Sequence, residues 1–388
     1  MSNDIQPEIR FPGFTEAWEQ RKLASMTNYK NGKGHEDKQS TIGKLELINL
    51  NSISISGGLK HSGKFIDEAD DTLQKDDLVM ILSDVGHGDL LERVALIPED
   101  DRFVLNQRVA LLRPNATADP QFLFFYINAH QYYFKAQGAG MSQLNISKGS
   151  VENFISFVPI IEEQKKIGTF FKQLDDTIAL HQRKLDLLKE TKKGFLQKMF
   201  PKNGAKVPEI RFPGFTEDWE QRKLGELTKI KTGSSDLQDA DAKGIYPFFV
   251  RSEIIERSNR YIFDGEAILI PGEGRLGEIY HYINGKFDFH QRVYKISDFQ
   301  YSDTDGKYIL YYMQKYFKKH AMKYTVKATV DSLRLPMLTE FDIKIPSLDE
   351  QRAISSFFSN LDQAITLHQR KLDLLKETKK GFLQKMFV

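Results

Sequence analysis

Cysteine is absent from this chain of 388 residues, which excludes disulfide bonds and thiolate metal sites. No stretch approaches the ~18 apolar residues that a membrane-spanning helix needs. The first residues, MSNDIQPEIR, lack the apolar run of a secretion signal. We therefore expect a soluble, cytoplasmic protein, and its length predicts two or three domains.

A large excess of one charge is also lacking, since the formal net charge is only +2. Residues 24–161 carry 13 Lys and Arg against 17 Asp and Glu, whereas residues 225–348 carry 18 against 17. The stretch 181–206 is the basic one, with 8 against 2. Any affinity for nucleic acid must therefore come from local patches or from a partner protein.

Motifs of a catalytic centre are missing as well. Residues 58–64 resemble a phosphate-binding loop, but Phe65 stands where a magnesium-binding Ser or Thr belongs and no helix pattern follows. The acidic run at 67–70 comes too soon after this loop to serve a nucleotide-hydrolysing fold. A Gly-x-Gly-x-x-Gly match at 272–277 precedes a strand pattern, whereas a dinucleotide-binding unit needs a helix there. No Pro-Pro pair and no His-Glu-x-x-His motif occurs, so we expect no catalytic residue, no cofactor and no metal site.

Two pairs of internal repeats organise the chain. The segment PEIRFPGFTEAWEQRKL at 7–23, the lead segment, returns at 208–224 with Ala17 replaced by Asp218. The segment HQRKLDLLKETKKGFLQKMF at 181–200 recurs unchanged at 368–387. The order is therefore a lead segment, a long variable region and a helix, followed by the same three parts again.

The variable regions, 24–161 and 225–348, share little identity but keep the same landmarks in one order. Each has an apolar strand with a Gly-rich loop, then a Gln-Arg-Val strand, then an aromatic helix, and each ends near a proline. The repeated helix stays identical while these regions diverge, which indicates different constraints on the two parts. We expect two domains of one fold that differ in their surfaces.

The apolar residues of each repeated helix follow the alternating steps of four and three that define a heptad seam. Two such helices can bury their seams on each other as an antiparallel, pseudo-two-fold coiled coil. A helix of about 35 residues is roughly 50 Å long, which exceeds one DNA turn of ~34–36 Å. A dimerisation coil between unrelated domains is the alternative. The predicted seam residues are Ile167, Phe171, Leu174, Ile178, Leu185 and Leu188, and Ile354, Phe358, Leu361, Ile365, Leu372 and Leu375.

This pattern resembles the specificity subunits of type I restriction-modification systems. The resemblance rests on the lead segment, on Pro-x-x-Glu/Asp-Glu-Gln at 159–164 and 346–351, on the heptad helix that ends GFLQKMF, and on the doubling of all three. It covers nearly the whole chain. It implies a non-catalytic subunit whose two target-recognition domains each bind half of a split site in double-stranded DNA. It also implies recruitment of two methyltransferase subunits and of restriction and translocation subunits.

The expected fold class is α+β, with two homologous mixed α/β target-recognition domains separated by two long helices that form the antiparallel coiled coil. We place the first target-recognition domain, with its lead segment, at 1–161 and the first spacer helix and linker at 162–206. The second recognition domain follows at 207–348, and the second spacer helix at 349–388. Two other functions stay open, a self-contained DNA-modifying enzyme and a structural scaffold without a DNA role.

Base readout requires polar and cationic side chains on exposed loops that reach the major groove. We place the candidate DNA-binding residues on three loops in each domain, at 28–35, 84–88 and 142–148 in the first and at 231–235, 274–277 and 327–334 in the second. Arg108 and Arg292, in the matched Gln-Arg-Val strands, fit a scaffold role as well as a DNA contact. The tail 195–200 and its copy are interpreted as apolar surfaces for the methyltransferase subunits. The candidates are Lys30, Lys33, His35, His87, Gln143, Asn145 and Lys148 in the first domain, and Lys231, Ser234, Arg275, Lys327, Thr329, Ser332 and Arg334 in the second.

Overall fold

The computed structural model describes residues 6–55, 57–85, 93–138, 143–202, 204–299, 303–324 and 332–388. The chain forms two compact units. The first unit consists of Met1–Gln182 together with Arg370–Val388, and the second unit of Arg183–Gln369. Each long helix therefore contributes residues to both units.

The first unit is built around a four-stranded antiparallel sheet and a three-stranded sheet. The strand order is β2-β9-β5-β7 in the former and β4-β3-β8 in the latter, where β3 and β8 are parallel. Two further pairs, β1-β11 and β10-β6, complete its sheets. Its elements are β1 (Glu19–Lys22), β2 (Thr27–Asn31), β3 (Leu45–Ile48), β4 (Phe65–Ile66), β5 (Leu78–Ile81), β6 (Ser83–Val85), β7 (Val94–Leu96), β8 (Phe103–Leu105), β9 (Val109–Pro114), α1 (Pro120–Ala129), α2 (Gln131–Gln137), β10 (Gln143–Asn145), α3 (Lys148–Glu152), β11 (Ile155–Val158) and the first part of α4 (Ile161–Lys198).

The second unit holds a six-stranded sheet with the order β13-β18-β16-β17-β14-β15 and the separate pair β12-β19. The pair β12-β19 repeats the pair β1-β11 of the first unit, because both join the end of a lead segment to the strand before a long helix. The elements are β12 (Glu220–Lys223), α5 (Leu224–Leu227), β13 (Lys229–Thr232), β14 (Tyr246–Phe249), β15 (Ile255–Ser258), β16 (Phe263–Pro271), β17 (His281–Phe289), β18 (Val293–Ser297), α6 (Gly306–Ala321), α7 (Leu335–Thr339), β19 (Asp342–Ile345) and the first part of α8 (Leu348–Lys385).

The repeated sequence at the start of each long helix forms a buried ion pair with the lead segment. Glu163 accepts two hydrogen bonds from the guanidinium of Arg10, both at 2.8 Å. Glu350 makes the same pair with Arg211 at 2.7 Å. Both carboxylates are almost fully buried. Because a buried charge requires a partner, the Glu at the start of each long helix requires the Arg of the lead segment beside it.

The glutamine that follows this Glu in each long helix binds the N-terminus of the aromatic helix, α1 or α6. The side-chain oxygen of Gln164 accepts the backbone N–H of Asp119 at 3.0 Å, and Gln351 accepts that of Asp305 at the same distance. Asp119 and Asp305 are the N-cap residues of α1 and α6. A side-chain oxygen at this position satisfies an N–H group that the helix itself cannot. The Glu-Gln motif thus connects the long helix to both the lead segment and the aromatic helix.

Antiparallel contacts between the two long helices occur in each unit. In the first unit, Asp175 of α4 pairs with Lys379 of α8 at 2.5 Å. In the second unit, Lys192 of α4 pairs with Asp362 of α8 at 2.7 Å. These are the same two sequence positions exchanged between the repeats. The expected α+β fold, with two homologous domains and two long coiled-coil helices, is confirmed.

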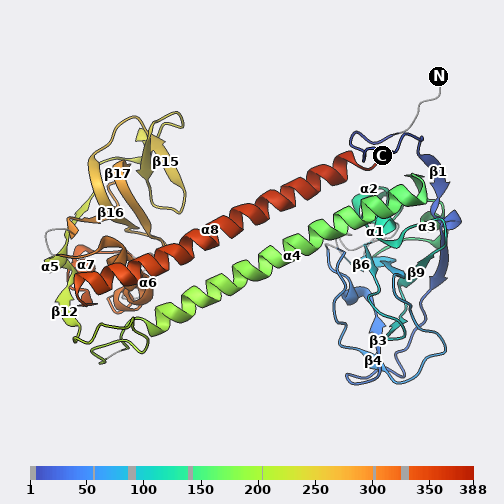
Figure 1. Cartoon of the computed structure of the whole chain (residues 1–388), viewed down its shortest axis with the longest axis horizontal. Helices are drawn as coiled ribbons and strands as arrows, with labels where there is room; N and C mark the ends of the chain where they lie inside the picture. The colour runs from blue at the N-terminus through green and yellow to red at the C-terminus, as the bar shows by residue number, and fades with distance from the viewer. Residues whose placement is uncertain are drawn as a thin grey trace. The chain divides into compact units, whose positions relative to one another are not determined.

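The end of each long helix is buried in a domain, and this corrects the interpretation of the GFLQKMF tails as partner surfaces. Met386 and Phe387 belong to the core of the first unit, where α8 ends beside α1 and α2 (Figure 1). Met199 and Phe200 belong to the core of the second unit. The ring of Phe200 stacks on Phe358 at 5.9 Å. Because heptad periodicity does not report what lies beyond the helix end, it could not place these residues.

Candidate nucleic-acid interface

The first predicted loop of each domain starts beside the Gln-Arg-Val strand, where the pairing of β2 with β9 and of β13 with β18 continues by one residue. The backbone N–H of Gly32 donates to the carbonyl of Val109 at 2.9 Å, and that of Gly233 donates to Val293 at 3.3 Å. A Cβ on Gly32 would lie only 1.8 Å from a backbone oxygen, and one on Gly233 only 2.0 Å. The close approach of two backbones therefore requires glycine at both positions.

The second loop is fastened to the same turn. Leu82 donates its backbone N–H to the carbonyl of Arg108 at 2.9 Å, and Gly272 donates to Arg292 at 2.7 Å. The two donors occupy the same place in the two domains, at the end of the apolar strands β5 and β16. The start of the second loop is thus fixed relative to the first.

The third loop is held by the second. Ile146 donates to the carbonyl of Leu82 at 3.0 Å, and Leu333 donates to that of Gly272 at 2.7 Å. Strand β10 also pairs with β6, and an isolated bridge joins Glu273 to Ser332 in the second domain. All three loops of each domain therefore converge on one turn through matching backbone hydrogen bonds. We call this arrangement the three-loop frame.

The Gln-Arg turn lies at the centre of the three-loop frame, and its residues are not among the predicted DNA-binding candidates. The side chains of Gln107, Arg108, Gln291 and Arg292 are all exposed. Arg108 adopts a left-handed backbone conformation, with φ of 64°, which is uncommon for a residue other than glycine. The available signal was the occurrence of the same exposed dipeptide in both otherwise divergent regions.

Carboxylates border this turn in both domains. Gln291 donates to Asp236 at 2.9 Å, and Gln107 contacts Glu36. Arg292 forms an ion pair with Glu273. These exposed pairs hold the polar side chains at the surface but contribute little stability.

In the first domain, Lys30, Lys33 and His35 line one small cavity. The prediction that every candidate lies on a loop is wrong for Lys30 on β2, Lys231 on β13, and Gln143 and Asn145 on β10, because these strands extend into the predicted loops. Lys30 pairs with Asp71. Lys148, from the third loop, lies 5.3 Å above the ring of Tyr29 on β2, so the frame brings it next to the first loop. The remaining candidates are less completely placed. Asn145 is exposed, Gln143 is placed by its backbone pairing with Val85, and His87 lies outside the described residues.

In the second domain, Lys231 and Ser234 line a basic cavity of about 390 Å³ together with Lys229 and Lys295. Lys295 is buried, and its ammonium group lies 3.5 Å from the centre of the Phe263 ring. Burial, together with the nearby Lys231 and Lys229, lowers the pKa of Lys295 to about 8, although Asp298 opposes the shift. Both burial and neighbouring positive charges disfavour the charged form of a lysine.

Arg275 is exposed and forms ion pairs with Glu253 and, at 3.8 Å, with Glu278. Contact with a base would require it to exchange these carboxylates for the DNA. Ser332 and Arg334 are exposed on the third loop, where Arg334 is the residue before α7. Lys327 and Thr329 lie outside the described residues.

The predicted seam residues are buried or half-buried in both long helices. Four of them are almost fully inaccessible beside a domain, namely Ile167, Phe171, Ile354 and Phe358. Leu185 and Leu372 are equally buried, with 1% of each exposed, although they lie in the middle of the helices. The seam positions near the start of each long helix thus make helix–domain contacts.

Other kinds of site find little support in the part of the chain that the structure describes. Within those residues, His, Asp and Glu side chains do not gather in groups of three or more that could hold a metal ion. None of the helices described there is both long and apolar enough to cross a bilayer.

The comparisons with known proteins agree with this geometry. The family model described as "Type I restriction modification DNA specificity domain" matches twice, at residues 15–190 and 216–377. The two matches together span most of the chain and fall on the two repeats. The chain therefore belongs to the family of type I restriction-modification DNA specificity proteins, and it carries two such domains.

Individual relatives are distant in sequence but similar over most of their length. The type I restriction enzyme MjaVIII specificity subunit of Methanocaldococcus jannaschii is 24% identical over 71% of this chain and 71% of its own. The putative MjaX specificity subunit of the same organism is 23% identical over 95% and 92%. The crystal structure of a type I S subunit from M. genitalium matches with a TM-score of 0.72 over 99% of both chains at 16% identity. At that identity the structural likeness supports the fold alone.

Proposed function

We propose that this protein is the non-catalytic DNA-recognition subunit of a type I restriction-modification complex, and that each domain reads one half of a split duplex site. The observation that carries the proposal is the three-loop frame, which is the same in both domains although the side chains on it differ. One frame with two sets of side chains suits the recognition of two different half-sites.

The frame also suggests how the contacts are divided. Contacts to phosphates fix the position of a protein on DNA, whereas contacts to base edges read the sequence. Arg108 and Arg292 are common to both domains and therefore suit phosphate contacts that every half-site offers. Residues that differ between the domains, such as His35 and Arg275, suit base readout, and an arginine paired with guanine is the commonest specific contact.

The charge of the two variable regions supports a need for partners. Sequence-independent affinity for DNA comes mainly from neutralised phosphates. Region 24–161 has four more acidic than basic residues, so it supplies little of this affinity. We infer that methyltransferase subunits, and restriction subunits where they are present, contribute the remaining phosphate contacts. The relatives named above are themselves specificity subunits of type I restriction enzymes.

The test is to express the chain with the methyltransferase subunit of its own system and to map the methylated sites in a host genome. We expect one interrupted motif, with two short specified parts separated by unspecified base pairs. A continuous motif would contradict the proposal, as would methylation that does not depend on this chain. The chain expressed alone should show no methyl transfer or DNA cleavage.

A further inference from the structure

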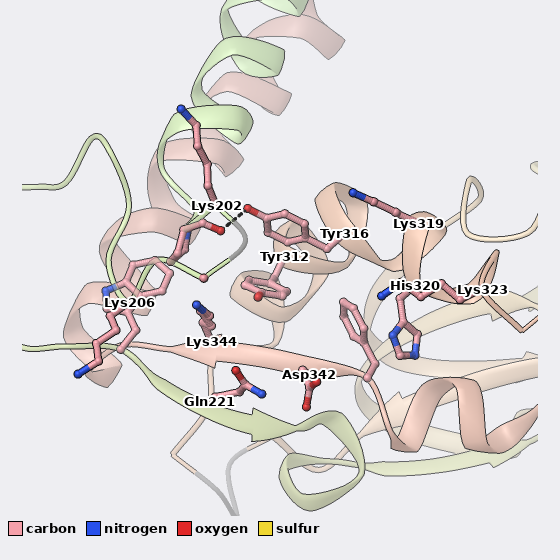
Figure 2. Close-up of a pocket in the computed structure, with 14 residues that line it drawn as sticks. Lys202, Lys206, Gln221, Tyr312, Tyr316, Lys319, His320, Lys323, Asp342 and Lys344 are labelled. Atoms are coloured by element: carbon pink, nitrogen blue, oxygen red, sulfur yellow. Dashed lines mark hydrogen bonds between the residues drawn. The ribbon is translucent and has the colours of Figure 1, made fainter.

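We propose that a basic pocket in the second unit binds a phosphate group, at a place separate from the three-loop frame. The pocket has a volume of about 640 Å³ and lies between the segment that follows α4, the end of α6 and the strand pair β12-β19 (Figure 2). Its only acidic lining residue among those described is Asp342. The basic lining residues are Lys202, Lys206, Lys319, His320, Lys323 and Lys344.

These cations come from three separate parts of the second unit. Lys319 and His320 lie on the last turn of α6, where the helix dipole favours positive charge. That effect does not account for Lys344 on β19 or for Lys202 in the segment after α4. Figure 2 shows these residues on the separate elements that border the pocket, and Tyr312 and Tyr316 also line it. The concentration of cations is therefore a property of the pocket and not of one helix end.

The first domain provides an internal control for what the fold itself requires. Counted along the sequence from the N-caps Asp119 and Asp305, Phe134 stands at the position of His320. Phe134 lies 4.7 Å from Phe154, and His320 lies 5.0 Å from Phe341, which Phe317 also contacts at 5.2 Å. Gln20 is paired with Phe157, in the register where Gln221 is paired with Lys344.

The residue that precedes Phe134 is Tyr133, at the position of Lys319. Three cations of the second domain thus replace aromatic residues of the first. Since the first domain folds without these charges, packing does not explain them.

The polar groups of the pocket are available to a ligand. Neither Lys319 nor Lys323 forms an ion pair with any residue that the structure describes. The Nε2 atom of His320 is buried without a hydrogen-bond partner. Burial lowers the pKa of His320, and Lys323 lowers it further, so a bound anion would relieve an unfavourable cluster. A buried polar atom that lacks a partner is uncommon in native proteins.

Of the other three lysines, Lys344 donates a hydrogen bond to the backbone carbonyl of Ala205, and the remaining two are held by exposed ion pairs. Lys202 pairs with Glu209 and Lys206 with Asp218, both at 2.8 Å. Exposed pairs of this kind contribute little, so either ammonium group can turn to an incoming anion.

Phosphate is the ligand chemistry that fits these groups. It offers several acceptor oxygens and up to two negative charges, and lysine ammonium groups bind it as point charges. The volume lies within the range of small-ligand pockets. The phosphate could belong to a nucleic-acid backbone or to a free polyphosphate or nucleotide, and the measurements below separate these sources.

The experiment uses the full chain and inorganic pyrophosphate, with binding measured by calorimetry at low salt. The test variant is Lys319→Gln/Lys323→Gln. The charge-matched control is Lys243→Gln/Lys286→Gln, two exposed lysines of the same unit that lie outside the pocket. We expect saturable binding by the wild type, at least tenfold weaker binding by the test variant, and less than a twofold change in the control. No saturable binding, or equal losses in both variants, would overturn the proposal.

A second variant guards against misfolding. His320→Phe introduces the residue that the first domain carries at this position, so folding is expected to persist while pyrophosphate binding falls severalfold. Trp219 borders the pocket, and in a Trp18→Phe background its fluorescence reports both folding and ligand. Unchanged binding in a folded His320→Phe protein would count against the site.

Duplex DNA of unrelated sequence identifies the source of the phosphate. If the Lys319→Gln/Lys323→Gln variant also loses affinity for this DNA, the pocket holds the nucleic-acid backbone. If only pyrophosphate and nucleotides are affected, the ligand is a free phosphate compound. The proposal does not depend on sequence-specific recognition, because pyrophosphate binding would persist even if no methylation motif were found.

Discussion

The buried pair between Arg10 and Glu163 offers the clearest test of how the lead segments hold the domains. Glu163 is completely buried, and only 10% of the Arg10 side chain is exposed. Breaking a buried pair by removing one charge costs about 3–5 kcal/mol, because the other charge stays behind unpaired. Glu163→Gln keeps one acceptor oxygen, so we expect a loss near the lower end, about 3 kcal/mol.

The two units can be followed separately because each contains one buried tryptophan, Trp18 or Trp219. In a Trp219→Phe background, urea unfolding monitored through Trp18 reports the first unit. The matched control is Asp176→Asn, which removes an exposed pair with Lys172 and should cost less than about 0.5 kcal/mol.

The double variant Arg10→Met/Glu163→Leu should recover most of the stability, since apolar replacement of a buried pair is often nearly neutral. Equal effects of Glu163→Gln and Asp176→Asn would refute this reasoning. So would a double variant that is less stable than Glu163→Gln alone.

Three further predictions concern the three-loop frame and the basic cavity around Lys295. Arg108→Gln or Arg292→Gln should weaken DNA binding by a similar factor on all sequences and reduce the salt dependence of binding by about one phosphate contact. The methylation motif should stay unchanged, and a changed motif would assign base readout to these arginines. Gly233→Ala should destabilise the second unit by about 1–3 kcal/mol, because the new methyl group meets a backbone oxygen, whereas the helical Gly194→Ala, with open space around it, should stabilise slightly; equal urea midpoints for the two would contradict this. Lys295 has a pKa of about 8 in the folded protein, against an ordinary value of 10.5. Between these two values the unfolded chain binds more protons, so the free energy of unfolding should rise with pH across that window. Lys295→Met should remove this part of the rise, and an identical pH profile of the urea midpoint would show that the lysine is not desolvated.

The repeats made the architecture predictable from the sequence. A lead segment and a helix that return almost unchanged leave few ways to arrange the chain, and both the two-domain α+β fold and the antiparallel helices follow from them. The loop candidates could be grouped because each domain keeps its landmarks in the same order. The convergence of the three loops was not predictable, since it depends on single backbone hydrogen bonds such as that from Leu82 to Arg108.

Other features could not be predicted from the sequence, for identifiable physical reasons. The burial of Phe200 and Phe387 depends on a domain that is distant along the sequence, so helix periodicity could not reveal it. The role of Arg108 and Arg292 was not predictable, because a strand pattern does not show that the backbone supports the frame while the side chain stays exposed. The basic pocket combines residues more than 100 positions apart, such as Lys202 and Lys319, and no local motif marks it.

An exchange of variable regions tests the central claim most directly. A chimera that carries residues 24–161 in place of 225–348 would present the same loops on both frames. Methylation mapped with the methyltransferase partner should then give a motif whose two parts are the same half-site in inverted orientation, with the spacing unchanged. If the folded chimera kept the original second half-site, or specified a continuous motif, two sibling domains on one frame would not be the basis of recognition.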